Sequence, residues 1–329
     1  MFSGNNTKDC IIVMSDDEKN IINGYTLLSE LTNEHSGFAK WGYAEKDGRA
    51  YFIKEFLSPV YPDKSSPLSN EQKKRKINEC DEWVERKKAV YSALNNTSNG
   101  NIIIPLDFFR SDSHYYSVTD KVDVSSLTAQ QISSLDTLNK LIILKVFSNC
   151  LKRIGEASII HGDLKPDNLL IKETVSGMYT VKLIDFDSSY LEAALPPPDE
   201  LQCDPTYMSP EAFLYIIGET DKLDKQSDIF SAGLIFHRYF CGELPTNDYI
   251  YEAVLDDAEV VLNDSIPPRI TQIISMMLKK NPSERLNSEY LWQLMLLTTQ
   301  SNLLKGTVDS ADAHAESKTY FYPASDDEW

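Results

Sequence analysis

Four polar residues in two short stretches form a candidate reactive centre. Asp163, Lys165 and Asn168 lie within HGDLKPDN, and Asp185 lies within VKLIDFD. An aspartate can orient or accept the proton of a hydroxyl group. Amide and carboxylate oxygens are ligands that Mg²⁺ accepts, and an ammonium group can hold phosphate charge. A lone aspartate would be a turn residue or a helix cap. Four polar residues of these types, flanked by apolar strand segments, indicate a functional site. The set suits phosphoryl transfer, in which positioning and charge neutralisation provide most of the catalysis.

The residues before this centre have the pattern of a sheet. Apolar residues alternate through 25–58, and Asp47-Gly48 separates two of the runs as a hairpin turn. Two more strands are predicted within NIIIPLDFF and YYSVTDKV. With the helix described next, residues 25–120 are predicted to form a small α+β lobe.

A long helix is predicted over residues 70–94. Ser69 and Gln72 have the spacing of a capping box at its start. A broken apolar stripe follows, formed by Ile77, Cys80, Val84, Tyr91 and Leu94. The basic run KKRK near its start could hold a phosphate, but a solvated helix end is the better interpretation.

The pattern becomes mainly helical from Leu135 onward. LNKLIILKVFSNCLKRI is apolar on most faces and predicts a buried helix. Two short strands around NLLI and VKLIDF are joined by a turn at Ser176-Gly177, and helical segments resume over 210–296. Residues 299–329 are rich in acidic residues and are predicted to be a flexible tail.

Composition and charge narrow the class of protein. The 329 residues are 42% hydrophobic and 25% charged, with a formal net charge of −18. The negative charge argues against a nucleic-acid partner. The five cysteines are scattered and lack metal-ligand spacing, which is typical of reduced thiols. The apolar runs are too short to cross a bilayer and the start does not resemble a signal peptide, so we expect a cytoplasmic protein without a membrane partner.

The motifs IIHGDLKPDNLLI at 159–171 and VKLIDFD at 181–187 resemble those of the eukaryotic-type (Hanks-type) Ser/Thr protein kinase family. The resemblance covers roughly residues 25–298. It implies an α+β, bilobal fold with a small antiparallel sheet lobe that carries one long helix, and a large, mainly helical lobe. The implied boundaries are a lead-in at 1–24, a small lobe at 25–120, a hinge at 120–124, a large lobe at 125–298 and an acidic tail at 299–329.

The resemblance assigns roles to the four polar residues. Asp163 matches the aspartate that orients the substrate hydroxyl, and Lys165 matches the lysine, typical of Ser/Thr kinases, that contacts the transferring phosphate. Asn168 and Asp185 match the two magnesium ligands. ATP and Mg²⁺ are therefore the implied cofactors.

The same resemblance identifies candidates for nucleotide binding nearer the start of the chain. Lys54 of YFIKEF matches the strand lysine that contacts the α- and β-phosphates. Its glutamate partner is expected on the 70–94 helix, where Glu79, Glu82 and Glu85 all qualify and Glu79 is preferred. Asp120 and Val122 lie in the expected hinge beside adenine.

The glycine-rich loop that covers the phosphates in the family is degraded here. Glu34, Ser36 and Ala39 stand at the three glycine positions, with Gly37 beside them. Because every Cβ takes space, such a loop approaches phosphate less closely. Ser36 and Gly37 remain the candidate loop contacts.

Further family motifs occur downstream. PTYMSPEAF resembles the end of an activation segment, and SDIFSAGLIF places Asp228 where it would brace the catalytic loop. Arg285 of NPSER is expected to pair with Glu211.

Three positions depart from the family pattern. Gly162 replaces the usual arginine, Asp187 replaces a glycine, and Asp204 replaces the threonine that bridges Asp163 and Lys165. We expect the negative charge of Asp204 to pair with Lys165 and to repel the carboxylate of Asp163.

The expected function is ATP- and Mg²⁺-dependent transfer of the γ-phosphoryl group to Ser/Thr hydroxyls of protein substrates, with autophosphorylation among the expected reactions. Two alternatives stay open: a small-molecule kinase of the aminoglycoside or choline type, and a pseudokinase scaffold. The small-molecule class usually lacks the downstream motifs that are present here, and a pseudokinase would normally have lost one of the matched residues. A regulatory partner is expected at the 70–94 helix or at the acidic tail.

Overall fold

The structure is a computed structural model that describes residues 21–34, 39–97, 100–122, 126–245 and 249–309. The described residues belong to two compact units, which are treated separately below. The small unit comprises Met1–Lys88 and Pro105–Asp123, and the large unit comprises Ala89–Ile104 and Val124–Trp329. Residues 89–104, which the sequence assigned to the small lobe, therefore group with the large unit.

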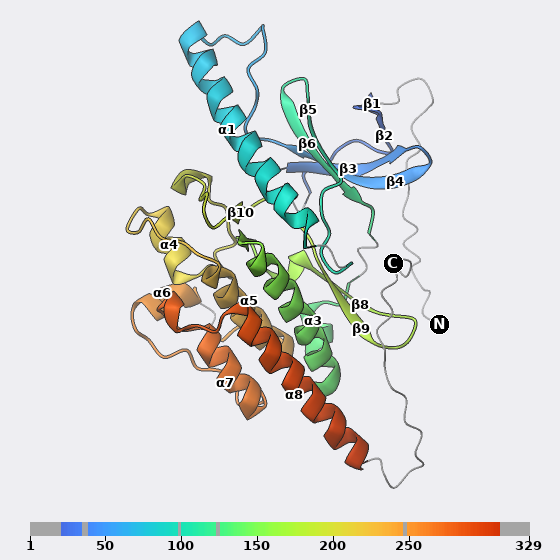
Figure 1. Ribbon diagram of the computed structural model, residues 1–329, viewed down its shortest axis with the longest axis vertical. Helices are drawn as coiled ribbons and strands as arrows, with labels where there is room; N and C mark the ends of the chain where they lie inside the picture. The colour runs from blue at the N-terminus through green and yellow to red at the C-terminus, as the bar shows by residue number, and fades with distance from the viewer. Residues whose placement is uncertain (1–20, 35–38, 98–99, 123–125, 246–248, 310–329) are drawn as a thin grey trace, which may run out of the picture. The chain divides into compact units, whose positions relative to one another are not determined.

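The small unit contains a six-stranded antiparallel sheet in the order β1-β2-β3-β4-β6-β5 (Figure 1). Its strands are β1 (Ile21–Ile22), β2 (Tyr25–Leu27), β3 (Ala39–Lys46), β4 (Arg49–Phe56), β5 (Asp107–Ser111) and β6 (His114–Asp120). Asp47 and Gly48 join β3 to β4 and both have positive φ, of 54° and 75°, as a two-residue type I′ hairpin requires. The predicted hairpin is therefore present, and one face of the sheet has a core that includes Ile53 and Val118.

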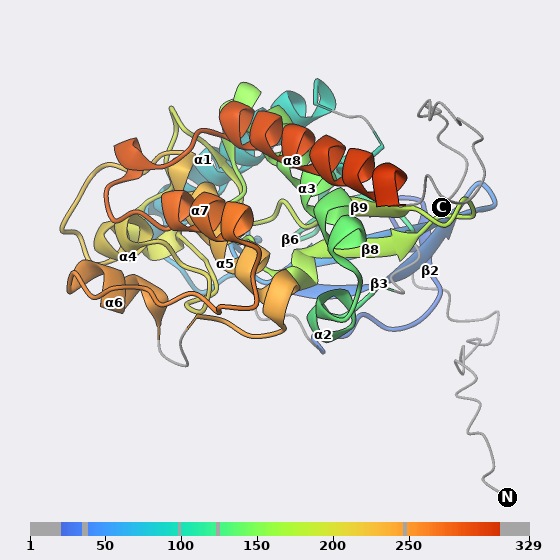
Figure 2. The same cartoon turned by 90° about the horizontal axis from the view of Figure 1, so that it is seen from below.

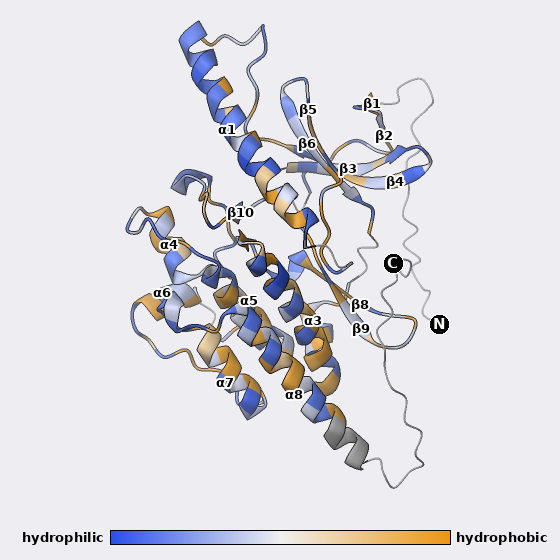
Figure 3. Ribbon diagram, in the orientation of Figure 1, coloured by the Kyte–Doolittle hydropathy of each residue, from blue (hydrophilic) through white to orange (hydrophobic). Residues whose placement is uncertain are grey.

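Helix α1 (Asn70–Asn95) begins at the predicted capping box. The Ser69 N–H donates to Gln72 Oε1 at 2.9 Å, and the Gln72 N–H donates to Ser69 Oγ at 3.2 Å. The helix is hydrophilic over its first turns and more apolar toward its C-terminal end (Figure 3). Trp83 packs on the sheet, with its ring centroid 5.1 Å from that of Phe56 and 5.2 Å from that of Tyr115.

The large unit is mainly helical. Its helices are α2 (Ala129–Ser133), α3 (Thr137–Glu156), α4 (Pro210–Ile216), α5 (Gln226–Cys241), α6 (Ile250–Leu255), α7 (Pro268–Met277) and α8 (Ser288–Asp309). Helices α3 and α5 carry the most buried apolar side chains, and α8 lies along α3 (Figure 2). Two short antiparallel pairs complete the unit: β7 (Ile159–Ile160) with β10 (Tyr190–Leu191), and β8 (Leu169–Glu173) with β9 (Tyr179–Leu183).

Helix α8 continues beyond residue 299, where the sequence predicted that the tail begins. Thr299 is buried and donates its hydroxyl proton to the Met295 carbonyl at 2.7 Å. The first part of the predicted tail, up to Asp309, is therefore helical. The remainder of the predicted tail and most of the lead-in lie outside the described residues.

The predicted α+β class, with one sheet unit and one mainly helical unit, is confirmed. Among the described helices, none is both long enough and apolar enough to cross a membrane.

Candidate active site

The strand pairs of the large unit bring the two motif stretches together. Leu169 of β8 pairs with Leu183 of β9, so the residues just before β8 lie beside the residues just after β9. The Ile184 N–H donates to the Asn168 carbonyl at 3.1 Å, which holds Asp185 next to Asn168 in the backbone. Pro166 begins a 3-10 turn over Pro166–Asn168, because its fixed φ suits the first position of a helical turn.

The Asp163 carboxylate is held from three directions. Its Oδ1 accepts from the Asp204 N–H at 2.9 Å, and its Oδ2 lies 2.9 Å from Lys165 Nζ. Asn168 donates from Nδ2 to the Asp163 carbonyl at 2.7 Å and to Oδ2 at 3.3 Å. These contacts fix the orientation of the carboxylate, and its side chain is 17% exposed.

Lys165 is charged at neutral pH. Burial lowers its pKa, but the hydrogen bond and charge of Asp163, together with the charge of Asp204, outweigh burial, so that the pKa is raised above its usual value. The Asp204 carboxylate lies 3.8 Å from Lys165 Nζ and also accepts from the Thr206 N–H at 2.9 Å. Asp204 therefore pairs with Lys165 as expected. Its contact with the Asp163 carboxylate is made by its backbone N–H and not by its own carboxylate.

Asp228 braces the catalytic loop from α5, as the motif predicted. Its carboxylate accepts from the His161 N–H at 2.7 Å and from the Gly162 N–H at 3.1 Å. Burial raises the pKa of this carboxyl above its usual value, although the hydrogen bonds from the two N–H groups favour the charged form and lower it. The His161 ring is also held, since its Nε2 lies 3.0 Å from the Ile184 carbonyl and must donate to it.

Gly162 occupies a position that disfavours a side chain. Its φ is +79°, in the left-handed region. A Cβ there would lie 2.9 Å from the Ser188 carbonyl oxygen and 3.0 Å from the Tyr190 ring. The absence of the family's arginine therefore fits the local packing.

Asn168 and Asp185 fit a magnesium ion by their donor atoms. Because Asn168 Nδ2 is used by Asp163, the amide oxygen is the atom left for a cation. Asp185 supplies a carboxylate from a backbone position with φ of +65°. Hard oxygen donors of this kind are what Mg²⁺ prefers.

Tyr91 lies close to the carboxylates of Asp185 and Asp187. Its pKa is raised well above the usual value, first by burial and then by the charges of Asp187 and Asp185. Tyr91 therefore keeps its proton beside the turn that carries Asp185 and Asp187. The sequence analysis assigned Tyr91 only to the apolar stripe of the 70–94 helix, because a tyrosine at helical spacing gives no signal that its hydroxyl reaches a carboxylate.

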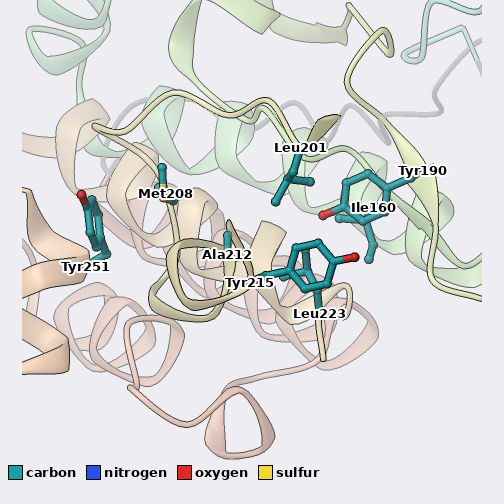
Figure 4. Close-up of a cluster of buried hydrophobic side chains, with 8 residues drawn as sticks. All are labelled: Ile160, Tyr190, Leu201, Met208, Ala212, Tyr215, Leu223 and Tyr251. Carbon is teal, nitrogen blue, oxygen red and sulfur yellow. The ribbon is translucent and has the colours of Figure 1, made fainter. Parts of the chain in front are cut away.

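The segment from 185 to 211 packs against the rest of the large unit near both of its ends, whereas residues 193–194 and 197–200 are exposed. Leu201 and Met208 share a buried cluster with α4 and α6, whose members are Ile160, Tyr190, Leu201, Met208, Ala212, Tyr215, Leu223 and Tyr251 (Figure 4). The Ser189 hydroxyl donates to the His161 carbonyl at 2.9 Å, and the Ser231 hydroxyl donates to the Tyr207 carbonyl at 2.7 Å. The segment is therefore fixed at both of its ends.

The predicted Glu211–Arg285 pair is present and bidentate. Arg285 Nη2 lies 2.8 Å from Glu211 Oε2, and Nη1 contacts Oε1. The Arg285 side chain is 0% exposed and also donates to the Gln226 carbonyl at 2.8 Å. The pair joins α4 to the loop before α8.

Among the candidates in the small unit, Lys54 and Glu79 do not form the expected pair. Lys54 lies on β4, with Nζ 6.0 Å from the centre of the Phe52 ring. Glu79 is half exposed and pairs with Arg75 and Lys76 of its own helix at 3.8 and 3.1 Å, so the structure does not join it to Lys54. A carboxylate near two basic neighbours on an exposed helix face pairs with them first.

The remaining candidates lie at the end of the sheet or outside the described residues. Asp120 ends β6 and forms an ion pair with Arg49. Val122 follows it in a half-buried loop position. Ser36 and Gly37 lie outside the described residues, so the predicted loop contacts stay predictions.

Comparison of the sequence with known protein families identifies the family of this chain. The family model described as protein kinase domain matches residues 69–296, more than half of the chain. Serine/threonine-protein kinase ATG1 of Pichia angusta is 23% identical over 249 residues, which are 62% of this chain and 30% of that protein. Serine/threonine-protein kinase PSK2 of Saccharomyces cerevisiae is 27% identical over 222 residues, 62% of this chain and 19% of that protein.

DNA damage response protein kinase DUN1 of Saccharomyces cerevisiae is 26% identical over 293 residues, which are 80% of this chain and 53% of that protein. The matches thus span at most about half the length of these relatives. The resemblance inferred from the motifs is confirmed, and the chain belongs to the protein kinase domain family.

Proposed function

We propose that this chain is a protein kinase that uses ATP and Mg²⁺ to phosphorylate serine or threonine hydroxyls of protein substrates, its own chain included. The observation that carries the proposal is the arrangement around Asp163. A carboxylate held by Lys165, by Asn168 and by the Asp204 N–H is positioned before a substrate arrives. Positioning of this kind supplies most of the protein's share of phosphoryl-transfer catalysis.

Each residue has one task in this proposal. Asp163 accepts a hydrogen bond from the substrate hydroxyl, directs its oxygen and takes its proton as the bond to phosphorus forms. Lys165, charged and 2.9 Å from Asp163, neutralises charge on the transferring phosphoryl group. Asn168 Oδ1 and the Asp185 carboxylate would hold Mg²⁺, which supplies charge neutralisation to the phosphates when bound. Lys54 is assigned to the α- and β-phosphates on family resemblance.

The proposal favours a protein substrate over a small molecule. The segment before Glu211 is anchored through the Glu211–Arg285 pair and through the Ser231–Tyr207 hydrogen bond. An ordered surface beside the catalytic aspartate suits an extended polypeptide, which needs more contacts than a small alcohol.

The test is incubation of the full chain with γ-labelled ATP, Mg²⁺ and generic protein substrates, followed by phosphoamino-acid analysis. We expect labelled phosphoserine or phosphothreonine. Asn168→Ala and Asp185→Ala should weaken Mg²⁺-dependent nucleotide binding, because each removes an oxygen ligand. Label found only on an aminoglycoside or on choline would identify a small-molecule kinase, and no transfer with intact nucleotide binding would identify a scaffold.

A further inference from the structure

Arg238 of α5 uses little of its hydrogen-bonding capacity within the large unit. Its Nη1 donates to the hydroxyl of Tyr207, in the segment that precedes Glu211. Among the residues that the structure describes, no carboxylate forms an ion pair with Arg238, and Tyr207 is its one side-chain hydrogen-bond partner. An arginine side chain has five N–H donors and a permanent positive charge. Most of the donors of Arg238 are therefore left for other partners.

Arg285 of the same unit shows what a structural role requires of an arginine. Its three nitrogens donate to the two oxygens of Glu211 and to three backbone carbonyls. The side chain is 0% exposed, so its charge is fully matched inside the protein. Arg238 has neither the carboxylate partner nor the full set of hydrogen bonds. Anchoring Tyr207 alone does not need the charge of Arg238, because a neutral N–H group can donate to a hydroxyl.

The N–H groups of Arg238 that have no protein partner reach solvent. The side chain is only partly buried. In the described part of the chain, none of its nitrogens is among the buried side-chain atoms that lack a hydrogen-bond partner. Because Nη1 is held by the Tyr207 hydroxyl, Nε and Nη2 remain as one edge with two parallel donors. This edge is accessible to a ligand.

A short series of contacts places Arg238 near the catalytic aspartate. The Asp204 N–H donates to Asp163 at 2.9 Å, and the Tyr207 N–H donates to the Asp204 carbonyl at 3.0 Å. Since Asp204 and Tyr207 are three residues apart, at most about 11 Å of chain separates them. Ser231 donates to the Tyr207 carbonyl at 2.7 Å, and Arg238 follows Ser231 by two turns on the same side of α5. Arg238 is therefore within reach of a short peptide whose hydroxyl lies at Asp163.

The acidic residues on either side of Tyr207 are engaged elsewhere. Residues 185–211 contain several acidic residues and no lysine or arginine. Asp204 lies 3.8 Å from Lys165, and Glu211 pairs with Arg285. A wholly acidic peptide would be repelled by this segment, whereas a single anionic side chain can meet Arg238 at contact distance, where the attraction is strongest.

We propose that Arg238 selects protein substrates by binding one anionic side chain, a carboxylate or a phosphate, a few residues from the acceptor hydroxyl. This inference rests on the proposed protein kinase activity and names the substrate feature that the site would select. A guanidinium edge with two donors matches the two oxygens of a carboxylate or a phosphate. The hydrogen bond to Tyr207 restricts the Arg238 side chain, so less freedom is lost when the anion binds.

The test measures how a charged neighbour changes the phosphorylation of a serine peptide by the full chain. The peptides carry one aspartate, one phosphoserine, one lysine or only neutral residues at each position near the acceptor serine. The kcat/KM of each charged peptide is divided by that of the neutral peptide. We expect the unmodified chain to favour aspartate or phosphoserine at one of these positions by about tenfold, the effect of one charge-assisted contact. The better of the two anions identifies whether the site takes a carboxylate or a phosphate.

Three variants separate the charge of Arg238 from its contact with Tyr207. Arg238→Gln keeps an N–H donor for the Tyr207 hydroxyl and removes the charge, so the ratio should fall to about one. Arg238→Lys keeps the charge and loses the planar edge, so part of the preference should remain. Arg238→Glu should favour lysine at the same position, because the sign of the charge is reversed.

Two further variants serve as controls. Arg269→Gln removes an equal charge from an exposed position of α7, and its ratio should equal that of the unmodified chain. Tyr207→Phe removes the hydroxyl that holds Arg238 but keeps the charge, so a preference for the anionic peptide should remain. Thermal unfolding checks that every variant is folded.

Several results would overturn the proposal. An equal preference in Arg238→Gln and in the unmodified chain would remove Arg238 from substrate selection. Equal loss on charged and neutral peptides would make its role structural, as an anchor of Tyr207. If Arg238→Gln does not fold, the unmodified chain decides: no preference for an anion at any position, or a preference for lysine, contradicts the proposal. Phosphorylation of the neutral peptide without charge preference leaves the proposed function standing, whereas no phosphorylation of any peptide contradicts that function.

Discussion

The catalytic loop of the large unit and the nucleotide-binding candidates of the small unit differ in how closely they follow the family pattern. Around Asp163, each motif residue has hydrogen-bond partners within the large unit. In the small unit, Glu79 faces its own helix neighbours. The difference teaches that the expected contacts around Asp163 are formed within the large unit, while the expected Lys54–Glu79 pair is not formed in the small unit.

The largest expected effect separates these two regions. Asp163→Asn should reduce phosphoryl transfer by ~10²–10⁴-fold, because the amide cannot accept the hydroxyl proton. ATP affinity should remain near that of the unmodified chain. Steady-state rates and calorimetric ATP binding measure the two quantities.

The control for this variant is Asp167→Asn, an exposed position of the same loop. We expect it to keep its activity. Equal rates for Asp163→Asn and the unmodified chain would remove Asp163 from the mechanism.

Local spacing explains which parts of the site were predictable. Asp163, Lys165 and Asn168 lie within one short loop, so their mutual positions follow from the loop's own turns. Asp228 and Arg285 were predicted with their partners from the family resemblance of SDIFSAGLIF and NPSER, and both contacts are present. The α+β class followed from the alternation of the strands and from the long apolar helix.

The partner of Lys54 could not be predicted in the same way. Three glutamates on α1 had acceptable spacing, and only the packing of Trp83 on Phe56 fixes which helix face meets the strand. The position of the Tyr91 hydroxyl and the residue at which α8 ends likewise depend on long-range packing. Thr299, at the predicted start of the tail, is buried in the large unit.

The second prediction concerns the buried ion pair between Glu211 and Arg285. Arg285→Ala should lower the free energy of unfolding of the large unit by about 3–5 kcal/mol, because it leaves the Glu211 carboxylate buried without its partner. Denaturant unfolding measures this loss. Arg269→Ala, an exposed arginine on α7, should change stability little. A similar small change in both variants would show that the buried pair does not stabilise the unit.

The third prediction is an acid sensitivity of the large unit that comes from His237. This residue is 1% exposed, its Nε2 accepts from the Asn263 N–H at 3.1 Å, and its Nδ1 donates to the Glu243 carbonyl at 2.8 Å. Burial lowers the pKa of His237 below its usual value of 6.5. The unfolded chain therefore takes up the proton at a higher pH than the folded chain does.

Stability contributed by neutral His237 is complete above about pH 6.5 and is lost as the pH falls through that value toward the lower folded pKa. Each unit of pKa difference is worth about 1.4 kcal/mol. Unfolding free energies measured from pH 8 to pH 5 should fall more steeply for the unmodified chain than for His237→Gln. Parallel curves would assign the acid sensitivity to other groups, such as the carboxylates.

The smallest expected effect concerns phosphorylation of the segment from 185 to 211, and it tests whether the catalytic region is complete as folded. In most kinases with an arginine before the catalytic aspartate, a phosphate on this segment neutralises that arginine. Gly162 brings no such charge, and its positive φ and close contacts disfavour any side chain there. The backbone N–H of Asp204 already holds Asp163. Six hydroxyl residues lie in this segment. Ser189, Tyr190, Tyr207 and Ser209 are buried, which leaves Ser188 and Thr206. We therefore expect Ser188→Ala and Thr206→Ala to change the rate by less than about twofold, as substitutions away from buried contacts usually do. The chain is co-expressed with a phosphatase, shown by mass spectrometry to be unmodified in this segment, and assayed. Activity that appears only after one of these hydroxyls is phosphorylated would show that the region around Asp163 is not complete as folded.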